Sequence, residues 1–368
     1  MASPFIYEEP VDPAELIDRA EELRLLGDRA LGSRNSRLEG ARRYGKTSLL
    51  RATLEQVERD GAIPIEVGFL GCVTASDVAQ RIERAYAAQL DSRLRRWYDG
   101  LVRTLNPTIS AAPAGVGVKA QPLVSAPGLL DRLALPRRVH ERTGRLCVIA
   151  FDEFQEVVRI HAALPGVFRS ELEAQGKAAA YIFSGSHPGL MRDLFSDRRH
   201  AFFAQAAPIE VGPLPPDELA EYIGARFDEG RRDPGEALGP LLDTAEGHPQ
   251  RAMLLGHHLY ERLDAGQTAD IEAWVDTLQA AQRETQGEIQ VLWESCTSLE
   301  RRVLKVIAQR TVALGSRDAE LRFGLTKGGS TQAAVERLFD SGHLIEDQAA
   351  RTGWRLVDPF LGAWLRES

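Results

Sequence analysis

LEGARRYGKTSLL, residues 38–50, is the stretch of sequence that decides the fold. It lies between a short apolar run and a helix-like run, and it contains the complete pattern G-x-x-x-x-G-K-[ST] from Gly40 to Thr47. Glycines let successive backbone N–H groups turn toward phosphates, and the following helix adds the partial positive charge of its N-terminus. A glycine turn that binds nothing is the alternative, but the complete pattern between strand and helix favours a phosphate-binding loop.

Two side chains of this loop have expected tasks, and its other residues are expected to surround the nucleotide. Lys46 is expected to bridge the β- and γ-phosphates of a nucleotide, and the Thr47 hydroxyl is expected to bind Mg²⁺. The loop residues expected around the nucleotide are Gly40, Ala41, Arg42, Arg43, Tyr44, Gly45, Lys46, Thr47 and Ser48.

A second motif, LCVIAFDEF at 146–154, is a continuous apolar strand that ends in two acids. Asp152 is expected at the carboxyl edge of the sheet, where it can hold the Mg²⁺ shell, with Glu153 beside it to polarise water. Neighbouring side chains on a strand point to opposite faces, so the two acids should have different roles. Two adjacent acids are otherwise simply a solvated strand end.

Polar and basic residues elsewhere are candidates for sensing the γ-phosphate. Ser184 or Ser186, after the apolar strand YIFSGSHPGLM at 181–191, could sense it or position water, although any turn uses such residues. Arg198 and Arg199 lie in a predicted loop that suits an arginine finger, and Arg251 near a helix start suits a lid contact. Each arginine could instead be an ordinary surface residue.

The chain of 368 residues should hold two or three domains. Continuous apolar strands separated by helices predict an α/β P-loop NTPase core, a parallel sheet with helices on both faces, over residues 1–214. Consecutive helices predict an all-α lid over 215–290. Two amphipathic helices with serine N-caps and a short hairpin predict a C-terminal winged-helix domain over 291–368.

Shorter segments complete this organisation. Residues 13–31 and 75–101 each read as one helix, and residues 106–127 read as a hairpin or a mobile loop. The three cysteines lie far apart in mostly apolar surroundings, which favours buried thiols over zinc ligands or disulfides.

The overall charge and hydropathy narrow the class of protein. A formal net charge of -8 argues against non-specific coating of nucleic acid, although one basic face could still bind it. No apolar window approaches the length of a membrane span, and the acidic, proline-containing N-terminus does not look like a signal peptide. We therefore expect a soluble, cytoplasmic protein without a membrane partner.

The order of these motifs resembles the archaeal-type ATPase family, a branch of the AAA+/STAND P-loop ATPases related to origin-recognition ATPases. The resemblance covers nearly the whole chain, from IDRAEEL at 17–23 through the phosphate loop to WRLVDPFLGAWL at 354–365, with Ala41 in place of the family's usual proline. It implies ATP or ADP with Mg²⁺ as ligands and Asp152 and Glu153 as the Walker B acids. It further implies Ser184 or Ser186 as sensor 1, Arg251 as sensor 2, and Phe5, Ile6 and Tyr7 at the adenine.

Three classes of function remain open for such an ATPase. One is a DNA-associated motor or loader for replication or recombination, and another is a slow signalling switch read by a protein partner or by self-association. The third is a nucleotide-stabilised scaffold with little turnover. For DNA, the tail offers Arg337, Arg351 and Arg355, but Glu336 and Asp340 lie beside them, so both charge signs occur in similar amount.

Overall fold

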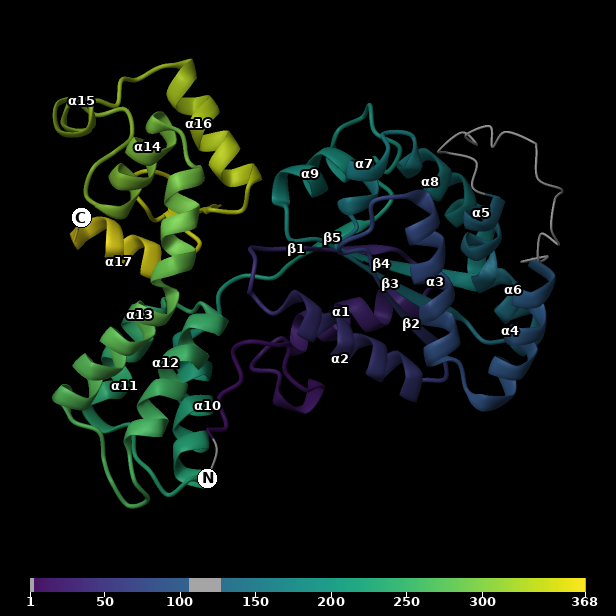
Figure 1. The fold of residues 1–368 in the computed structure, drawn as a ribbon, viewed down its shortest axis with the longest axis horizontal. Coiled ribbons are helices and arrows are strands. Elements are labelled where there is room, and N and C mark those ends of the chain that lie inside the picture. The colour runs from purple at the N-terminus through teal and green to yellow at the C-terminus, as the bar shows by residue number, and fades with distance from the viewer. Residues whose placement is uncertain (1–2, 106–126, 368) are drawn as a thin grey trace, which may run out of the picture.

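The computed structural model describes residues 3–105 and 127–367, and its centre is a five-stranded parallel sheet (Figure 1). The strand order is β2-β3-β4-β1-β5, so the strand that leads into the phosphate loop pairs with β4 on one side and β5 on the other. The strands are β1 (Ser36–Glu39), β2 (Ile63–Gly68), β3 (Cys147–Asp152), β4 (Ala179–Ser184) and β5 (Ala207–Glu210).

Helices cover both faces of this sheet, as the apolar strands predict. On β3, Val148 and Ala150 face the cluster that contains α1 and α2, whereas Ile149 and Phe151 face the opposite cluster, because successive strand residues alternate. The helices of this part are α1 (Ala20–Leu31), α2 (Lys46–Arg59), α3 (Ala75–Gln89), α4 (Ser92–Leu105), α5 (Pro127–Leu133), α6 (Leu135–Thr143), α7 (Glu156–Ile160), α8 (Leu164–Gln175) and α9 (Pro188–Ser196), with 3-10 turns η1 (Pro13–Glu15) and η2 (Gly176–Ala178).

The single helix expected over residues 13–31 is instead broken between η1 and α1. Asp18 and Arg19 adopt left-handed backbone angles, with φ of 50° and 91°, which a continuing right-handed helix cannot accommodate. The buried Arg19 guanidinium donates to the Gly212 carbonyl and pairs with Glu22. The break therefore aims Arg19 at the segment that leaves the sheet.

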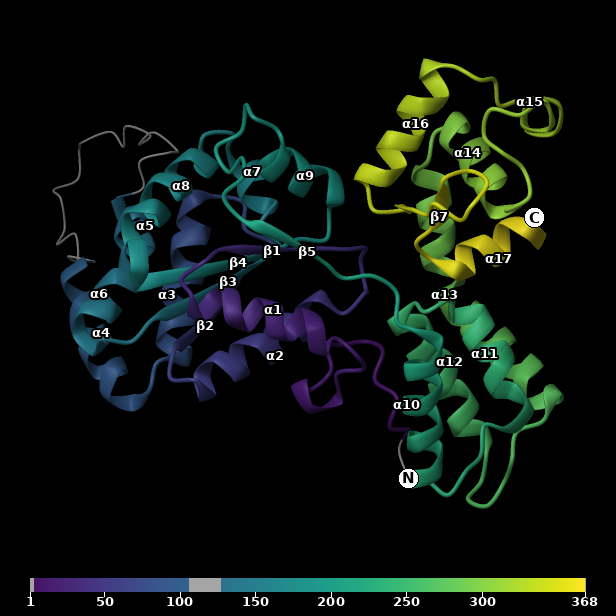
Figure 2. The ribbon, with the colours of Figure 1, turned by 180° about the vertical axis from the view of Figure 1, so that it is seen from behind.

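The second half of the chain is helical and lies on one side of the sheet in both views (Figures 1 and 2). Its first helices are α10 (Pro216–Glu229), the 3-10 turn η3 (Gly235–Ala237), α11 (Leu238–Ala245), α12 (Pro249–Arg262) and α13 (Ile271–Ser295). The C-terminal part comprises α14 (Ser298–Ala308), α15 (Arg317–Phe323), α16 (Gly329–Asp340), the antiparallel strands β6 (Leu344–Glu346) and β7 (Trp354–Leu356), and α17 (Pro359–Glu367).

This arrangement confirms the predicted fold class, a P-loop NTPase core followed by helical parts, and the tail has the helix and hairpin order of a winged helix. The domain boundary predicted at residue 290 falls within α13, which runs unbroken from the lid helices into the tail. We call residues 215–290 the lid and residues 291–367 the tail.

Several local predictions were wrong in detail. The expected serine N-caps are absent, since Thr297 caps α14 through a capping box with Glu300 and Gly328 precedes α16 without a side-chain cap. The run at 75–101 divides at Asp91, whose carboxylate accepts from the backbone N–H groups of Arg93 and Leu94 and starts a new helix.

Three further expectations concern the segment 106–127, the cysteines and possible membrane spans. The hairpin or loop predicted for 106–127 lies, apart from Pro127, outside the described residues. Cys72, Cys147 and Cys296 are buried free thiols. Among the described helices, none has the length and apolar character needed to cross a membrane.

Candidate functional site

The phosphate loop has the backbone geometry that its sequence predicts. It leaves β1 at Gly40 and enters α2 at Lys46, with Gly45 and Arg43 in left-handed conformations at φ of 87° and 66°. A Cβ on Gly40 would lie 2.4 Å from the Val211 carbonyl oxygen, so only glycine lets the loop pass this close to the end of β5. The conformation turns the loop around a concave surface in front of α2.

Lys46 is folded back over its own loop. Its ammonium donates to the carbonyl oxygens of Gly40 and Ala41 at 2.8 and 2.7 Å. Burial lowers the pKa of Lys46 to about 8, although Glu153 and Asp152 oppose the shift. Two neutral carbonyl groups thus bind the desolvated Lys46 ammonium, which would bind a negatively charged acceptor more strongly.

Thr47 and Asp152 meet at the carboxyl edge of the sheet. The Thr47 hydroxyl donates to Oδ2 of Asp152 at 3.1 Å, which joins the start of α2 to the end of β3. A hydroxyl and a carboxylate side by side are hard oxygen ligands of the kind that Mg²⁺ prefers, so these residues fit the metal expected from the sequence.

Glu153 follows directly after the last residue of β3, so the alternation expected along the strand does not place it. Its backbone has φ of 53°, and its carboxylate accepts from the Ser186 hydroxyl at 2.8 Å and from the side-chain amide of Gln155. Ser184 is fully buried, and its Oγ has no hydrogen-bond partner within the described parts of the chain. Of the two candidate serines, Ser186 is therefore the one that contacts the predicted catalytic acid.

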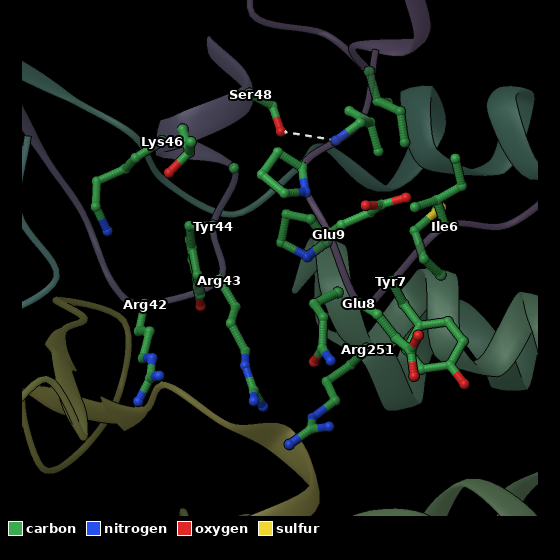
Figure 3. Close-up of a pocket in the computed structure, with 18 of the residues that line it drawn as sticks. Ile6, Tyr7, Glu8, Glu9, Arg42, Arg43, Tyr44, Lys46, Ser48 and Arg251 are labelled. Carbon is green, nitrogen blue, oxygen red and sulfur yellow. Dashed lines mark hydrogen bonds between the residues drawn. The ribbon is translucent and has the colours of Figure 1, made fainter. Parts of the chain in front are cut away.

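A cavity of about 500 Å³ connects these residues at the junction of the core and the lid. The loop residues Arg42 to Ser48, both acids, both serines and Arg251 all line it. Figure 3 shows the N-terminal segment crossing this cavity, where the Val11 N–H donates to the Ser48 hydroxyl at 3.2 Å. Residues far apart in the sequence thus share one site.

The N-terminal residues expected at the adenine are divided between two places. Ile6 and Tyr7 line the cavity, and Tyr7 packs edge-on against His257 of α12. Phe5 lies outside the cavity, buried in the lid core against Phe227 and Tyr260. A large aromatic ring there anchors the N-terminal segment to the lid helices.

Arg251 is 1% exposed and forms a bidentate ion pair with Asp358 of the tail. Nε and Nη2 donate to the two carboxylate oxygens at 3.0 and 2.6 Å, while Nη1 is buried without a partner in the described structure. Glu288 of α13 lies 3.8 Å from Arg251 and binds Arg43 of the loop through both of its oxygens.

Arg198 and Arg199 do not reach this cavity. Arg199 is exposed and pairs with Asp197, and Arg198 lies over the ring of Phe203. They can act on a nucleotide only if it belongs to another copy of the chain.

Sequence analysis gave no role to four residues that hold the site together: Arg19, Gln155, Glu288 and Asp358. Asp358 was visible only as part of the phrase VDPF, to which no task was attached. Glu288 lies within a helical run in which acids are common, so nothing in the sequence singled it out.

No protein-family model and no curated protein sequence matches the chain. Solved structures do match it. A Walker-type ATPase of Pyrococcus abyssi is 21% identical with a TM-score of 0.70, and the match covers 98% of this chain and 99% of that one. The ORC2 protein of Aeropyrum pernix, in ADPNP–ADP complexes, is 16% identical with a TM-score of 0.62, covering 99% of this chain and 96% of that one.

The ORC1 protein of Aeropyrum pernix, in complex with DNA, is 16% identical with a TM-score of 0.50, covering 98% of this chain and 94% of that one. These likenesses extend over the core, the lid and the tail together. The chain therefore shares its fold with this Walker-type ATPase and with the ORC proteins, which agrees, at the level of the fold, with its resemblance to the archaeal-type ATPase family.

Proposed function

We propose that the chain binds ATP with Mg²⁺ and hydrolyses it, and that the nucleotide state repositions the tail. The observation that carries this proposal is the hydrogen bond from Thr47 to Asp152 beneath a complete phosphate loop. It brings the expected metal-binding oxygens together from segments 105 residues apart in sequence.

In this mechanism the loop amides and Lys46 bind the triphosphate, and Thr47 and Asp152 would hold Mg²⁺. The metal, when bound, neutralises charge on the phosphates as the γ-phosphoryl group is transferred. Glu153 accepts a proton from the attacking water, and Ser186 holds its carboxylate in place. Arg251 supplies positive charge from the lid, and Arg198 or Arg199 would do so only from a second copy.

Motion of the tail follows from the position of the cavity. A nucleotide there touches both core and lid, so it favours whichever relative orientation gives it the better contacts. Because α13 is one continuous helix, the tail follows the lid. We propose residues 1–214, 215–290 and 291–368 as the functional units of this cytoplasmic switch, read by a protein partner or by self-association.

Two substitutions test the proposal by separating binding from turnover. Lys46→Ala should abolish binding of Mg-ATP in calorimetry, because the loop loses its cation. Glu153→Gln should bind Mg-ATP as the wild type does but release no phosphate. Lys177→Ala, on the exposed turn η2, is the matched control and should leave both unchanged. Normal turnover in Glu153→Gln would remove Glu153 from the mechanism.

DNA binding through the tail is a second candidate, favoured by the full-length likeness to an ORC1 protein that was solved with DNA. Against it, Arg337 pairs with Glu300 at 2.8 Å and Arg355 lies 3.7 Å from Asp347. Retention on a duplex DNA column that falls with salt would support DNA binding. If the protein is not retained on DNA and associates with itself in an ATP-dependent manner in light scattering, the signalling switch is supported. If the protein holds ATP but hardly hydrolyses it, a scaffold is supported.

A further inference from the structure

The C-terminal tail places a carboxylate inside the candidate nucleotide site. After β7 the chain passes Val357, which packs in the same apolar cluster as Ala41 and Tyr44 of the phosphate loop. The next residue, Asp358, binds the buried Arg251 through two hydrogen bonds. Of two successive tail residues, one therefore packs in the apolar cluster of the loop and the next binds the lid arginine that lines the cavity.

The charges along this contact form a chain from the loop to the tail. Arg43 binds Glu288, Glu288 lies 3.8 Å from Arg251, and Arg251 binds Asp358. In Figure 3 the side chains of Arg43 and Arg251 both extend toward the ribbon of the C-terminal segment. Of the arginines that line the cavity, Arg43 and Arg251 are thus each paired with a carboxylate of the chain itself.

A planar guanidinium pairs with phosphate in the same forked geometry as with carboxylate. Burial raises the pKa of Asp358, but the hydrogen bonds and charge of Arg251, together with His248 and the Phe360 N–H, leave this pKa below its usual value. The carboxylate is therefore charged at neutral pH. A polyphosphate bound beside it would repel it and would offer Arg251 a more highly charged acceptor.

We propose that Asp358 competes with the nucleotide phosphates for Arg251, so that docking of the tail and binding of nucleotide weaken each other. This inference rests on the proposed nucleotide site and adds its regulation. Glu288 acts in the same way on Arg43. The ion pair of Arg192 and Asp340, whose side chains are 48% and 34% exposed, contributes little. The tail also packs through α16 on α9 and shares an apolar core with the lid. The competition therefore loosens the segment around Asp358, and the rest of the tail stays joined to the lid.

Competition is reciprocal, which makes the proposal quantitative. If Asp358 weakens nucleotide binding by some factor, saturating nucleotide must weaken docking of the tail by the same factor. Couplings of this kind are typically of the order of tenfold. A residue that merely orients Arg251 toward the phosphates would have the opposite effect on affinity.

The test uses the full chain and two measurements. Calorimetry with Mg-ADP gives the Kd for the wild type, for Asp358→Asn and for Glu346→Gln, a control that neutralises an exposed acid of the hairpin. Hydrogen exchange over residues 354–361, with and without Mg-ADP, reports docking of the tail. We expect Asp358→Asn to bind roughly tenfold more tightly, the control to match the wild type, and wild-type exchange at 354–361 to rise with nucleotide.

Weaker or unchanged binding in Asp358→Asn, with wild-type exchange that does not rise, would overturn the competition. The wild-type exchange experiment needs no substitution, so it still decides the matter if Asp358→Asn does not fold. If the wild type binds no nucleotide at all, the proposed function fails. If it binds nucleotide and the tail stays docked, only the competition fails.

Discussion

Replacing Ser186 by alanine should slow ATP hydrolysis without weakening ATP binding. The Ser186 hydroxyl donates to the Glu153 carboxylate at 2.8 Å, and its backbone N–H lies 3.3 Å from the same oxygen. A hydrogen bond to a charged group contributes about 1.5–3 kcal/mol. If that stabilisation holds Glu153 in position for proton transfer, its loss lowers kcat by roughly 10- to 150-fold.

Ser184→Ala is the matched control, because it removes the same kind of group, a serine hydroxyl, at the end of β4, two residues before Ser186. The Ser184 Oγ is buried and has no hydrogen-bond partner within residues 3–105 and 127–367. The contact that Ser184 does make, from the Phe154 N–H to its carbonyl oxygen, uses the backbone and survives the substitution. Its kcat should therefore stay within about twofold of the wild type.

Single-turnover phosphate release with saturating Mg-ATP measures the chemical step, and calorimetry with a non-hydrolysable analogue measures binding. The reasoning is refuted if Ser186→Ala hydrolyses ATP at the wild-type rate, or if Ser184→Ala loses as much. A parallel loss of binding in Ser186→Ala would mean that the hydroxyl contacts the nucleotide rather than orienting Glu153.

The remaining predictions concern the phosphate loop. Gly40→Ala should lower the free energy of unfolding by about 1–3 kcal/mol in thermal or urea melts, because its Cβ would meet the Val211 carbonyl at 2.4 Å. Gly100→Ala should not lower the free energy of unfolding, because a Cβ at Gly100 has open space. If Gly40→Ala is as stable as Gly100→Ala, the close approach of Gly40 to Val211 is contradicted. Nucleotide affinity should fall as pH rises above about 8, the lowered pKa of Lys46, because the ammonium loses its charge. Calorimetry at several pH values measures this, and a constant Kd through about pH 9.5 would show that the charge of Lys46 does not limit binding.

Local patterns account for the parts of the site that the sequence predicted. The loop from Gly40 to Thr47 binds through its own backbone, and Asp152 follows directly from a buried strand, so short stretches of sequence contain both signals. Strands β3 and β4 were found for the same reason, because both are continuous apolar runs. The edge strand β5 was missed because its four residues include a proline and have a mixed burial pattern.

Long-range contacts account for what the sequence could not predict. Asp358 meets Arg251 across 107 residues, and Glu288 meets Arg43 across 245. Neither acid lies in a pattern that distinguishes it from a solvated surface residue. The break at Arg19 was equally hidden, since the Gly212 carbonyl that this left-handed arginine binds lies 193 residues away.

The continuity of α13 has a mechanical consequence. A helix of 25 residues is about 37 Å long, at 1.5 Å per residue. A rotation of about ten degrees at its lid end therefore carries its other end through roughly 6 Å, as far as one full turn of a helix. The α13 residues that line the cavity, Glu284 and Glu288, lie near the tail end of this rod. Movement at the cavity therefore passes almost directly into the tail, and the long arm of the rod swings the far end of the lid.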